Sequence, residues 1–285
     1  MTLEWRREPE IIWPPETSGR PVVPGRPEVE EFFETFGQRS NRDSLDGLYR
    51  EVLGRLRGDN GGRGFPRPPG GEIIEPDEEP GPTEACAYYL SFRFGPAWGI
   101  YIGVDCWVTM ARYLHRNGIP AEIAVDEAFM YMFLHEYFHF AVDTSTVIFE
   151  RAVGKSTGSY QDHWVAHHRA NNPSLLEEAL ANAHAYKNAG KRATGSHGEH
   201  VRSLLAHWMR RQPPGYRDFE DVCAGRGSLG EARSQLMSEI MGIHRRSNSS
   251  VPGLESLFHL PSFSRSGQKP FGQKFEGKPL NIYFY

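Results

Sequence analysis

Phe133-Leu134-His135-Glu136-Tyr137-Phe138-His139-Phe140 is the stretch on which the architecture of this chain depends. It lies inside an apolar run, residues 124–149, that contains no proline or glycine and has the length of a buried helix. On a helix, histidines four residues apart lie on one face, about 6 Å apart along the axis, so both imidazoles can reach one metal ion. The intervening Glu136 can then approach a water molecule at that ion. The alternative is a pair of core histidines that are hydrogen-bonded to carbonyl groups.

A third ligand is expected from a second helix, because a catalytic zinc ion usually has three protein ligands and a water molecule. The helix predicted at 174–189 carries Glu177, Glu178 and, four residues after the latter, Asn182. Ser174 and Glu177 form a capping-box pattern, so Glu177 is predicted to cap its own helix, whereas Glu178 shares a face with Asn182 and can point at the metal. The alternative is that both glutamates are exposed acids, favoured in a first turn by the helix dipole.

Asn182 and Asp143 are the candidates for supporting the zinc-bound histidines. Asn182 is predicted to accept a hydrogen bond from the ring N–H of one of them and so to fix its tautomer. Asp143 stands four residues after His139 on the same face, so it is either a similar acceptor or the third ligand. The acceptor role is favoured, because three ligands on one straight helix span about 12 Å. A histidine six residues after His139 is excluded, since that position is Ser145.

Two further histidine pairs have spacing that suits a metal ion, but the sequence places no acid beside them. These pairs are His163 with His167, and His197 with His200. They are therefore expected to be surface histidines.

The HExxH pattern followed by Glu178 and Asn182 resembles the active-site helix pair of gluzincin metallopeptidases, the thermolysin-like group in the broad sense, over residues 130–186. The resemblance implies bound Zn²⁺, a protein or peptide substrate, and Glu136 as the general base that activates water. It also implies a zincin-like α+β fold with an antiparallel sheet edge above the cleft, for which residues 85–104 are the candidate. A downstream residue that steadies the oxyanion is expected too, and the unranked candidates are Tyr160, His163, His168 and Tyr186.

Two other functions fit the same pattern. One is a non-catalytic binding protein in which zinc is a structural staple, a class whose sites are closed by four protein ligands. The other is a toxin or defence effector whose peptidase site acts on one dedicated target.

The rest of the chain predicts an α+β protein, mainly helical with a small antiparallel sheet, flanked by an irregular N-terminal arm and a C-terminal tail. The expected divisions are 1–83, with two short helices and a Gly/Pro-rich linker; 84–245, the catalytic domain; and 246–285, the tail. The tail ends in a strand-forming hexapeptide, 280–285, that should be paired, either as an ordinary edge strand or across the cleft. Further helices are expected at 28–36, 43–56, 106–117 (with Asp105 as N-cap and Gly118 as stop), 199–211 and 230–243, and strands at 85–94 and 98–104.

Charge and composition narrow the class of protein. The net charge of −4 and the pI near 6.3 give no electrostatic footprint for nucleic acid. No apolar run is long enough to span a membrane and none resembles a secretory signal, so a cytoplasmic location is expected, with export by a signal-less route left open. The three cysteines are odd in number and lack C-x-x-C spacing, which predicts neither a disulfide framework nor a thiolate zinc site. Nothing in the sequence specifies the oligomeric state.

Overall fold

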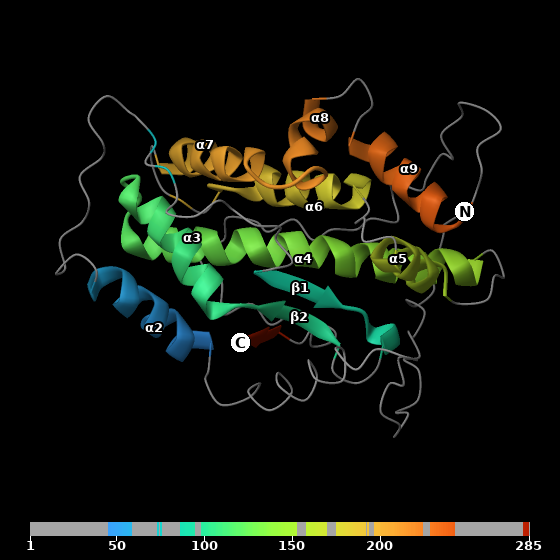
Figure 1. Cartoon of the computed structure of the whole chain (residues 1–285), viewed down its shortest axis with the longest axis horizontal. Helices are drawn as coiled ribbons and strands as arrows, with labels where there is room; N and C mark the ends of the chain where they lie inside the picture. Colours follow the sequence, from blue (N-terminus) through green and yellow to red (C-terminus); the bar gives the residue numbers. More distant parts are fainter. Residues whose placement is uncertain are drawn as a thin grey trace, which may run out of the picture.

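A computed structural model describes residues 45–58, 73, 75, 86–94, 98–152, 158–169, 175–191, 193, 197–224, 229–242 and 282–284. The predicted arm, the helix expected at 28–36 and most of the tail lie outside these residues. The described part is mainly helical with a small sheet, as expected for an α+β protein (Figure 1). The helices are α2 (Leu45–Gly58), α3 (Val104–Arg116), α4 (Ala121–Ala152), α5 (Ser159–Arg169), α6 (Leu175–Asn188), α7 (His197–Arg210), α8 (Phe219–Ala224) and α9 (Leu229–Ile240). Two 3-10 turns, η3 (Phe92–Phe94) and η4 (Tyr216–Asp218), and three strands, β1 (Ala87–Leu90), β2 (Gly99–Ile102) and β3 (Ile282–Phe284), complete them.

Helix α4, which carries the HExxH pattern, is the central element of the fold. It runs across the middle of the molecule, with α6, α7, α8 and α9 on one side and the sheet and α2 on the other, while α3 crosses its first half in this view (Figure 1). Because apolar residues occupy every face, it is buried on all sides from Ala124 to His139 with few exceptions. It begins directly after Pro120, whose carbonyl accepts the N–H of Ala124. A helix held in this way offers rigid positions for side chains along its length.

The turn before α4 follows one prediction and departs from another. Gly118 has a φ of 87°, a left-handed conformation that suits glycine, and it ends α3 as predicted. Asp105, however, is not the N-cap. The helix starts at Val104 after Gly103, which offers no side chain for capping, and Asp105 lies in the first turn.

The sheet has the order β1-β2-β3. Strands β1 and β2 form the predicted antiparallel pair, with Ala87 opposite Ile102 and Leu90 opposite Gly99. The predicted C-terminal strand is also present and is paired, but it lies parallel to β2, with Ile100 opposite Ile282. The sheet is therefore mixed rather than purely antiparallel. Since β3 lies on the far side of β2 from β1, its position is that of an edge strand and leaves the outer edge of β1 free of β3.

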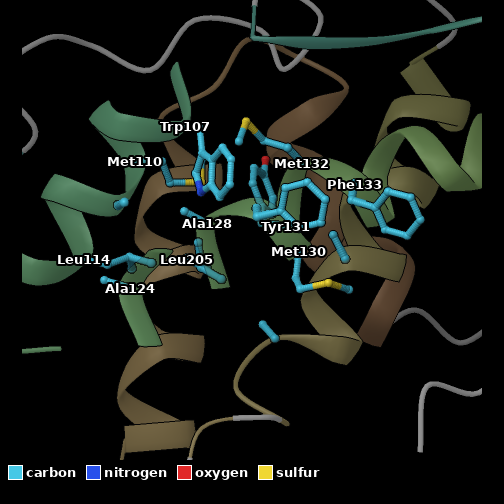
Figure 2. Packing of buried hydrophobic residues seen from close by; sticks show 14 of the residues in the cluster. Trp107, Met110, Leu114, Ala124, Ala128, Met130, Tyr131, Met132, Phe133 and Leu205 are labelled. Carbon is cyan, nitrogen blue, oxygen red and sulfur yellow. The ribbon is translucent and has the colours of Figure 1, made fainter. Parts of the chain in front are cut away.

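The main hydrophobic core fixes α3 and α7 against the first half of α4 (Figure 2). Trp107 is fully buried, its ring lies 5.2 Å from that of Phe129, and its indole N–H donates to the carbonyl of Val125 at 2.9 Å. Leu114 of α3 and Leu205 of α7 belong to the same cluster. This packing anchors α4 at the end before the histidine pair.

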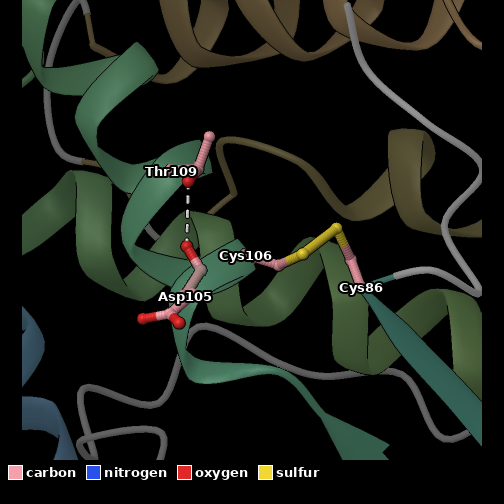
Figure 3. Close-up of a disulfide and its surroundings, with 4 residues drawn as sticks. All are labelled: Cys86, Asp105, Cys106 and Thr109. Atoms are coloured by element: carbon pink, nitrogen blue, oxygen red, sulfur yellow. Dashed lines mark hydrogen bonds between the residues drawn. A yellow bond between two sulfur atoms is a disulfide. The ribbon is translucent and has the colours of Figure 1, made fainter. Parts of the chain in front are cut away.

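A disulfide joins Cys86 to Cys106, so the prediction of no disulfide is wrong (Figure 3). The hairpin explains the pairing. Cys86 precedes β1 and Cys106 follows β2, and the antiparallel register brings these two ends together, with Cα atoms 5.2 Å apart. Because disulfides persist in oxidising environments, the bond gives no support to the expected cytoplasmic location. None of the described helices combines the length and apolarity needed to cross a lipid bilayer.

Candidate metal centre

Three donor atoms converge where α4 packs against α6. His135 and His139 direct their Nε2 atoms toward each other at 3.3 Å, and Oε2 of Glu178 lies 3.1 Å from the first and 3.5 Å from the second. These three residues are the one group among the described residues in which three such ligand atoms lie within 4.8 Å of one another. The predicted candidate ligands are thus brought together. They are 0%, 8% and 5% exposed, so His139 and Glu178 form the outer side of the group.

The hydrogen bonds behind the rings decide which nitrogens carry protons. Nδ1 of His135 lies 2.8 Å from Oδ1 of Asn182, and Nδ1 of His139 lies 2.8 Å from Oε1 of Glu177. Both partners are acceptors, so each Nδ1 carries the hydrogen and each neutral ring presents an Nε2 lone pair to the other. With the carboxylate of Glu178, three lone pairs then face one point. Two imidazole nitrogens and a carboxylate oxygen in this arrangement can hold a metal ion between them.

The pKa shifts at the site reflect the attraction between the histidines and the two carboxylates. Burial disfavours the charged form of His139, but the carboxylates of Glu178 and Glu177 outweigh it and raise its pKa well above the usual range. Burial likewise opposes ionisation of Glu177 and Glu178, yet the neighbouring histidines lower the pKa of Glu177 to about 2 and that of Glu178 well below its usual range. Both carboxylates are therefore charged, which is the state in which a carboxylate binds a metal ion.

Asn182 holds His135 as predicted, through a network in which all its polar atoms are used. Its Oδ1 accepts hydrogen bonds from Nδ1–H of His135 and from the hydroxyl of Tyr131, the latter at 3.0 Å. Its Nδ2 donates to Oε1 of Gln212 at 2.8 Å and to the carbonyl of Tyr216 at 2.7 Å. These bonds fix the orientation of the amide, and with it the tautomer of His135.

Glu177, predicted to cap its own helix, directs its carboxylate toward His139. Ser174, its expected partner, lies outside the described residues. Glu177 is 4% exposed and points into the protein, where Oε1 accepts from His139 and from the hydroxyl of Tyr160 at 2.9 Å. Its Oε2 lies 3.3 Å from Nε2 of His163. The alternative of two exposed first-turn acids is wrong, because Glu177 is buried against α4 and α5, and Glu178 is buried against α4.

The other histidine pairs are not surface groups either. The rings of His163 and His167 lie 4.4 Å apart on α5, and the His163 side chain is only 8% exposed. The acid that the sequence did not reveal beside this pair is Glu177, since it comes from the next helix. His200 is half-buried and lies 2.8 Å from the carbonyl of Asn117, a structural contact.

Asp143 supports neither histidine and is not a third ligand. It is fully buried and accepts hydrogen bonds from the hydroxyls of Tyr89 and Ser91 and from Nε of Arg93 at 2.8 Å. Arg93 also contacts Glu150, whose Oε1 accepts the backbone N–H groups of 158 and 159 at the start of α5. The role predicted for Asp143 belongs to Glu177. Asp143 instead binds the end of β1 and the residues that follow it, up to Arg93, to α4.

Glu136 lies beside the ligands with one oxygen uncommitted. The backbone N–H of Tyr89 on β1 donates to its carboxylate, while Oε1 has no hydrogen-bond partner among the described residues. The side chain is 1% exposed, and burial raises its pKa despite the opposing effect of His135 and His139. A carboxylate in this state is well placed to take up a proton.

The residues proposed for steadying an oxyanion are mostly engaged elsewhere. Tyr160 and His163 contact Glu177, and the ring of Tyr186 packs on Phe219 at 5.1 Å. The side chain of His168 lies outside the described part. The sequence analysis missed Tyr216, whose ring stacks on His135 with centroids 5.9 Å apart. No motif marks Tyr216, so only the fold could reveal it.

Comparison of the chain with models of protein families, with curated protein sequences and with solved structures finds no match in any of the three.

Proposed function

We propose that this protein is a zinc-dependent peptidase, with His135, His139 and Glu178 as zinc ligands and Glu136 as general base. The observation that carries the proposal is the pair of Nε2 lone pairs that meet a carboxylate while both Nδ1–H groups are held by acceptors. Three protein ligands of this kind are typical of catalytic zinc sites, where the fourth position is left to water. Zinc suits the set better than magnesium or calcium, which prefer oxygen ligands.

When bound, zinc would lower the pKa of a water molecule and polarise a peptide carbonyl. The protein's own part in the reaction falls to Glu136. Its free Oε1 accepts the proton of the attacking water and later delivers it to the leaving amine. The N–H of Tyr89 holds the other side of this carboxylate, and burial favours its protonated form, which assists uptake of the proton.

The outer edge of β1 offers a place for the substrate. Tyr89 contacts Glu136 through its backbone, so β1 runs past the proposed base, and β2 pairs with β1 on the opposite edge. An extended peptide can add to such an edge through main-chain hydrogen bonds. We propose that this edge has the role expected for the 85–104 hairpin in a zincin-like fold.

The proposal is tested by Glu136→Gln, compared with Glu127→Gln as a matched control. Glu127 is a second buried glutamate of α4, and its Oε2 accepts the N–H of Gly190 rather than facing the ligands. We expect Glu136→Gln to keep its zinc and lose peptide hydrolysis by about a thousandfold, the usual contribution of a general base. Glu127→Gln should keep both. Full activity of Glu136→Gln would remove the mechanism.

The deep burial of the ligands favours a second candidate, a non-catalytic protein that uses zinc as a staple. A structural site has four protein ligands, so this candidate requires a ligand beyond the three described ones. X-ray absorption spectroscopy of the zinc-loaded protein separates the two. A water oxygen in the fourth position supports the peptidase, and a fourth protein donor supports the staple.

A further inference from the structure

Three half-buried aromatic side chains gather beside the proposed base and form what we call the aromatic shelf: Phe92, Trp98 and Phe140. The ring of Trp98 stacks on that of Phe140, with centroids 6.1 Å apart and planes 13° from parallel. Phe92 meets Trp98 edge to face at 6.3 Å. Phe140 comes from α4, Phe92 from η3 and Trp98 from the residue before β2, so the shelf joins the tip of the hairpin to the catalytic helix.

The shelf lies close to Glu136, at a distance that about two residues of an extended peptide span. Phe140 follows Glu136 by four positions, so the two share a helix face and are about 6 Å apart along the axis. Tyr89 connects them, because its backbone N–H contacts Glu136 and its ring meets Phe140 edge to face at 5.8 Å. Adjacent residues of an extended peptide are about 3.4 Å apart. A side chain within about two residues of the scissile bond can therefore rest on the shelf.

The direction of β1 decides which side of the scissile bond this is. Along the hairpin, Tyr89 contacts Glu136, whereas Arg93 contacts Asp143 and Glu150, so β1 and η3 run in the same direction as α4. The shelf therefore lies beyond the C-terminal end of β1. A peptide that pairs antiparallel to β1, the more stable pairing, has its N-terminal part at this end.

The charge beside the shelf is already neutralised. The guanidinium of Arg93 lies 5.7 Å from the ring centre of Phe92, but it is paired with the carboxylates of Asp143 and Glu150. It is not available to attract an acidic substrate side chain. The aromatic shelf therefore favours apolar substrate side chains over acidic ones.

We propose that the aromatic shelf binds a large apolar or aromatic side chain on the N-terminal side of the scissile peptide bond. This inference rests on the proposed function, in that it names the substrate class of the same site. Phe92, Trp98 and Phe140 set specificity, and the preference comes from apolar surface that leaves water and from ring stacking.

The test measures peptide binding to zinc-loaded Glu136→Gln, which separates recognition from catalysis. Two pools of end-blocked hexapeptides are compared, randomised at every position except the third, which is Phe in one pool and Ala in the other. We expect about tenfold tighter binding of the Phe pool, as burial of one ring face would give. Equal binding of the two pools overturns the inference.

Substitutions in the Glu136→Gln background locate the preference. Adding Trp98→Ala or Phe140→Ala should abolish it with zinc content unchanged, and adding Trp98→Phe should retain most of it. Ile148→Ala, which removes an apolar side chain of α4 that is 45% exposed, is the control and should retain all of it. A preference that survives both Trp98→Ala and Phe140→Ala overturns the assignment to the shelf.

Cleavage of the same pools by the wild-type protein keeps the two proposals apart. If the Phe pool binds better but neither pool is cut, the peptidase proposal fails, and the shelf stands only as a binding surface for a large apolar side chain. If peptides are cut without any preference for a large apolar residue before the cleaved bond, the peptidase proposal stands and the shelf fails.

Discussion

The two histidines of the candidate metal centre are held in chemically different ways. His135 donates a hydrogen bond from Nδ1 to a neutral amide, that of Asn182. This amide belongs to a network with Tyr131, Gln212 and Tyr216. His139 donates a hydrogen bond from Nδ1 to a charged carboxylate, that of Glu177, which also contacts Tyr160 and His163 of α5. The support of His135 is a buried network of neutral hydrogen bonds, and the support of His139 is a hydrogen bond to a charged carboxylate. We therefore expect damage to the first to lower both stability and metal affinity, and damage to the second to lower metal affinity with little change in stability.

Asn182→Ala should have the largest effect. It leaves the Nδ1–H of His135 without this acceptor and removes one hydrogen bond each from Tyr131 and Gln212, which stay bonded to each other, and an unsatisfied buried group weakens the fold by about 1–3 kcal/mol. We expect the free energy of unfolding to fall by about 3 kcal/mol and zinc affinity to fall about a hundredfold. Urea denaturation and chelator competition measure the two quantities. Asn188→Ala is the control and should lose well under about 1 kcal/mol, because the Asn188 amide donates to the carbonyl of His184 within α6 and accepts only from the exposed Nζ of Lys191.

Removal of the disulfide should affect stability alone. Cys86 and Cys106 are separated by 20 residues, and closing a loop of this length stabilises a fold by about 3 kcal/mol in the chain-entropy model. Zinc affinity should stay the same, because α4 and α6 supply all three candidate ligands. The double variant Cys86→Ser with Cys106→Ser tests this, with Cys223→Ser as the control for a free cysteine. A parallel loss of zinc affinity would mean that the hairpin, and not only the helix pair, holds the site.

Glu177→Gln should give the smallest and most selective effect. The amide still accepts from His139 but no longer carries the charge that raises the basicity of the ring. We expect about tenfold weaker zinc binding with little change in the free energy of unfolding. Tyr160→Phe, which removes one hydrogen bond to Glu177 and keeps the charge, should weaken binding less. If Glu177→Gln binds zinc as tightly as the wild type, the charge on Glu177 does not contribute to zinc affinity, and the proposed difference between the two histidines is wrong.

The sequence predicted what depends on local periodicity. An uninterrupted apolar run with i, i+4 histidines is sufficient for α4 and for the direction of both rings, and the face shared by Glu178 and Asn182 is a property of one helix. The antiparallel hairpin was likewise predictable from Tyr- and Ile-rich runs that flank Gly95-Pro96. These features require no knowledge of how distant segments pack.

What the sequence could not predict depends on contacts between elements. Glu177 satisfies a local capping pattern, but the packing of α5 over α6 turns its carboxylate to His139. Asp143 satisfies a local spacing rule, but Arg93 of η3 claims it. Cys86 and Cys106 pair because the hairpin register brings its two ends together. In each case a tertiary contact prevailed over a local pattern.

Metal stoichiometry tests the central claim most directly. Zinc content per chain is measured by native mass spectrometry for the wild type, His135→Ala, Glu178→Ala and His163→Ala after identical purification. We predict about one zinc ion per chain in the wild type and in His163→Ala, and essentially none in His135→Ala and Glu178→Ala. A wild type that binds no zinc, or a Glu178→Ala variant that binds it as the wild type does, would contradict the account.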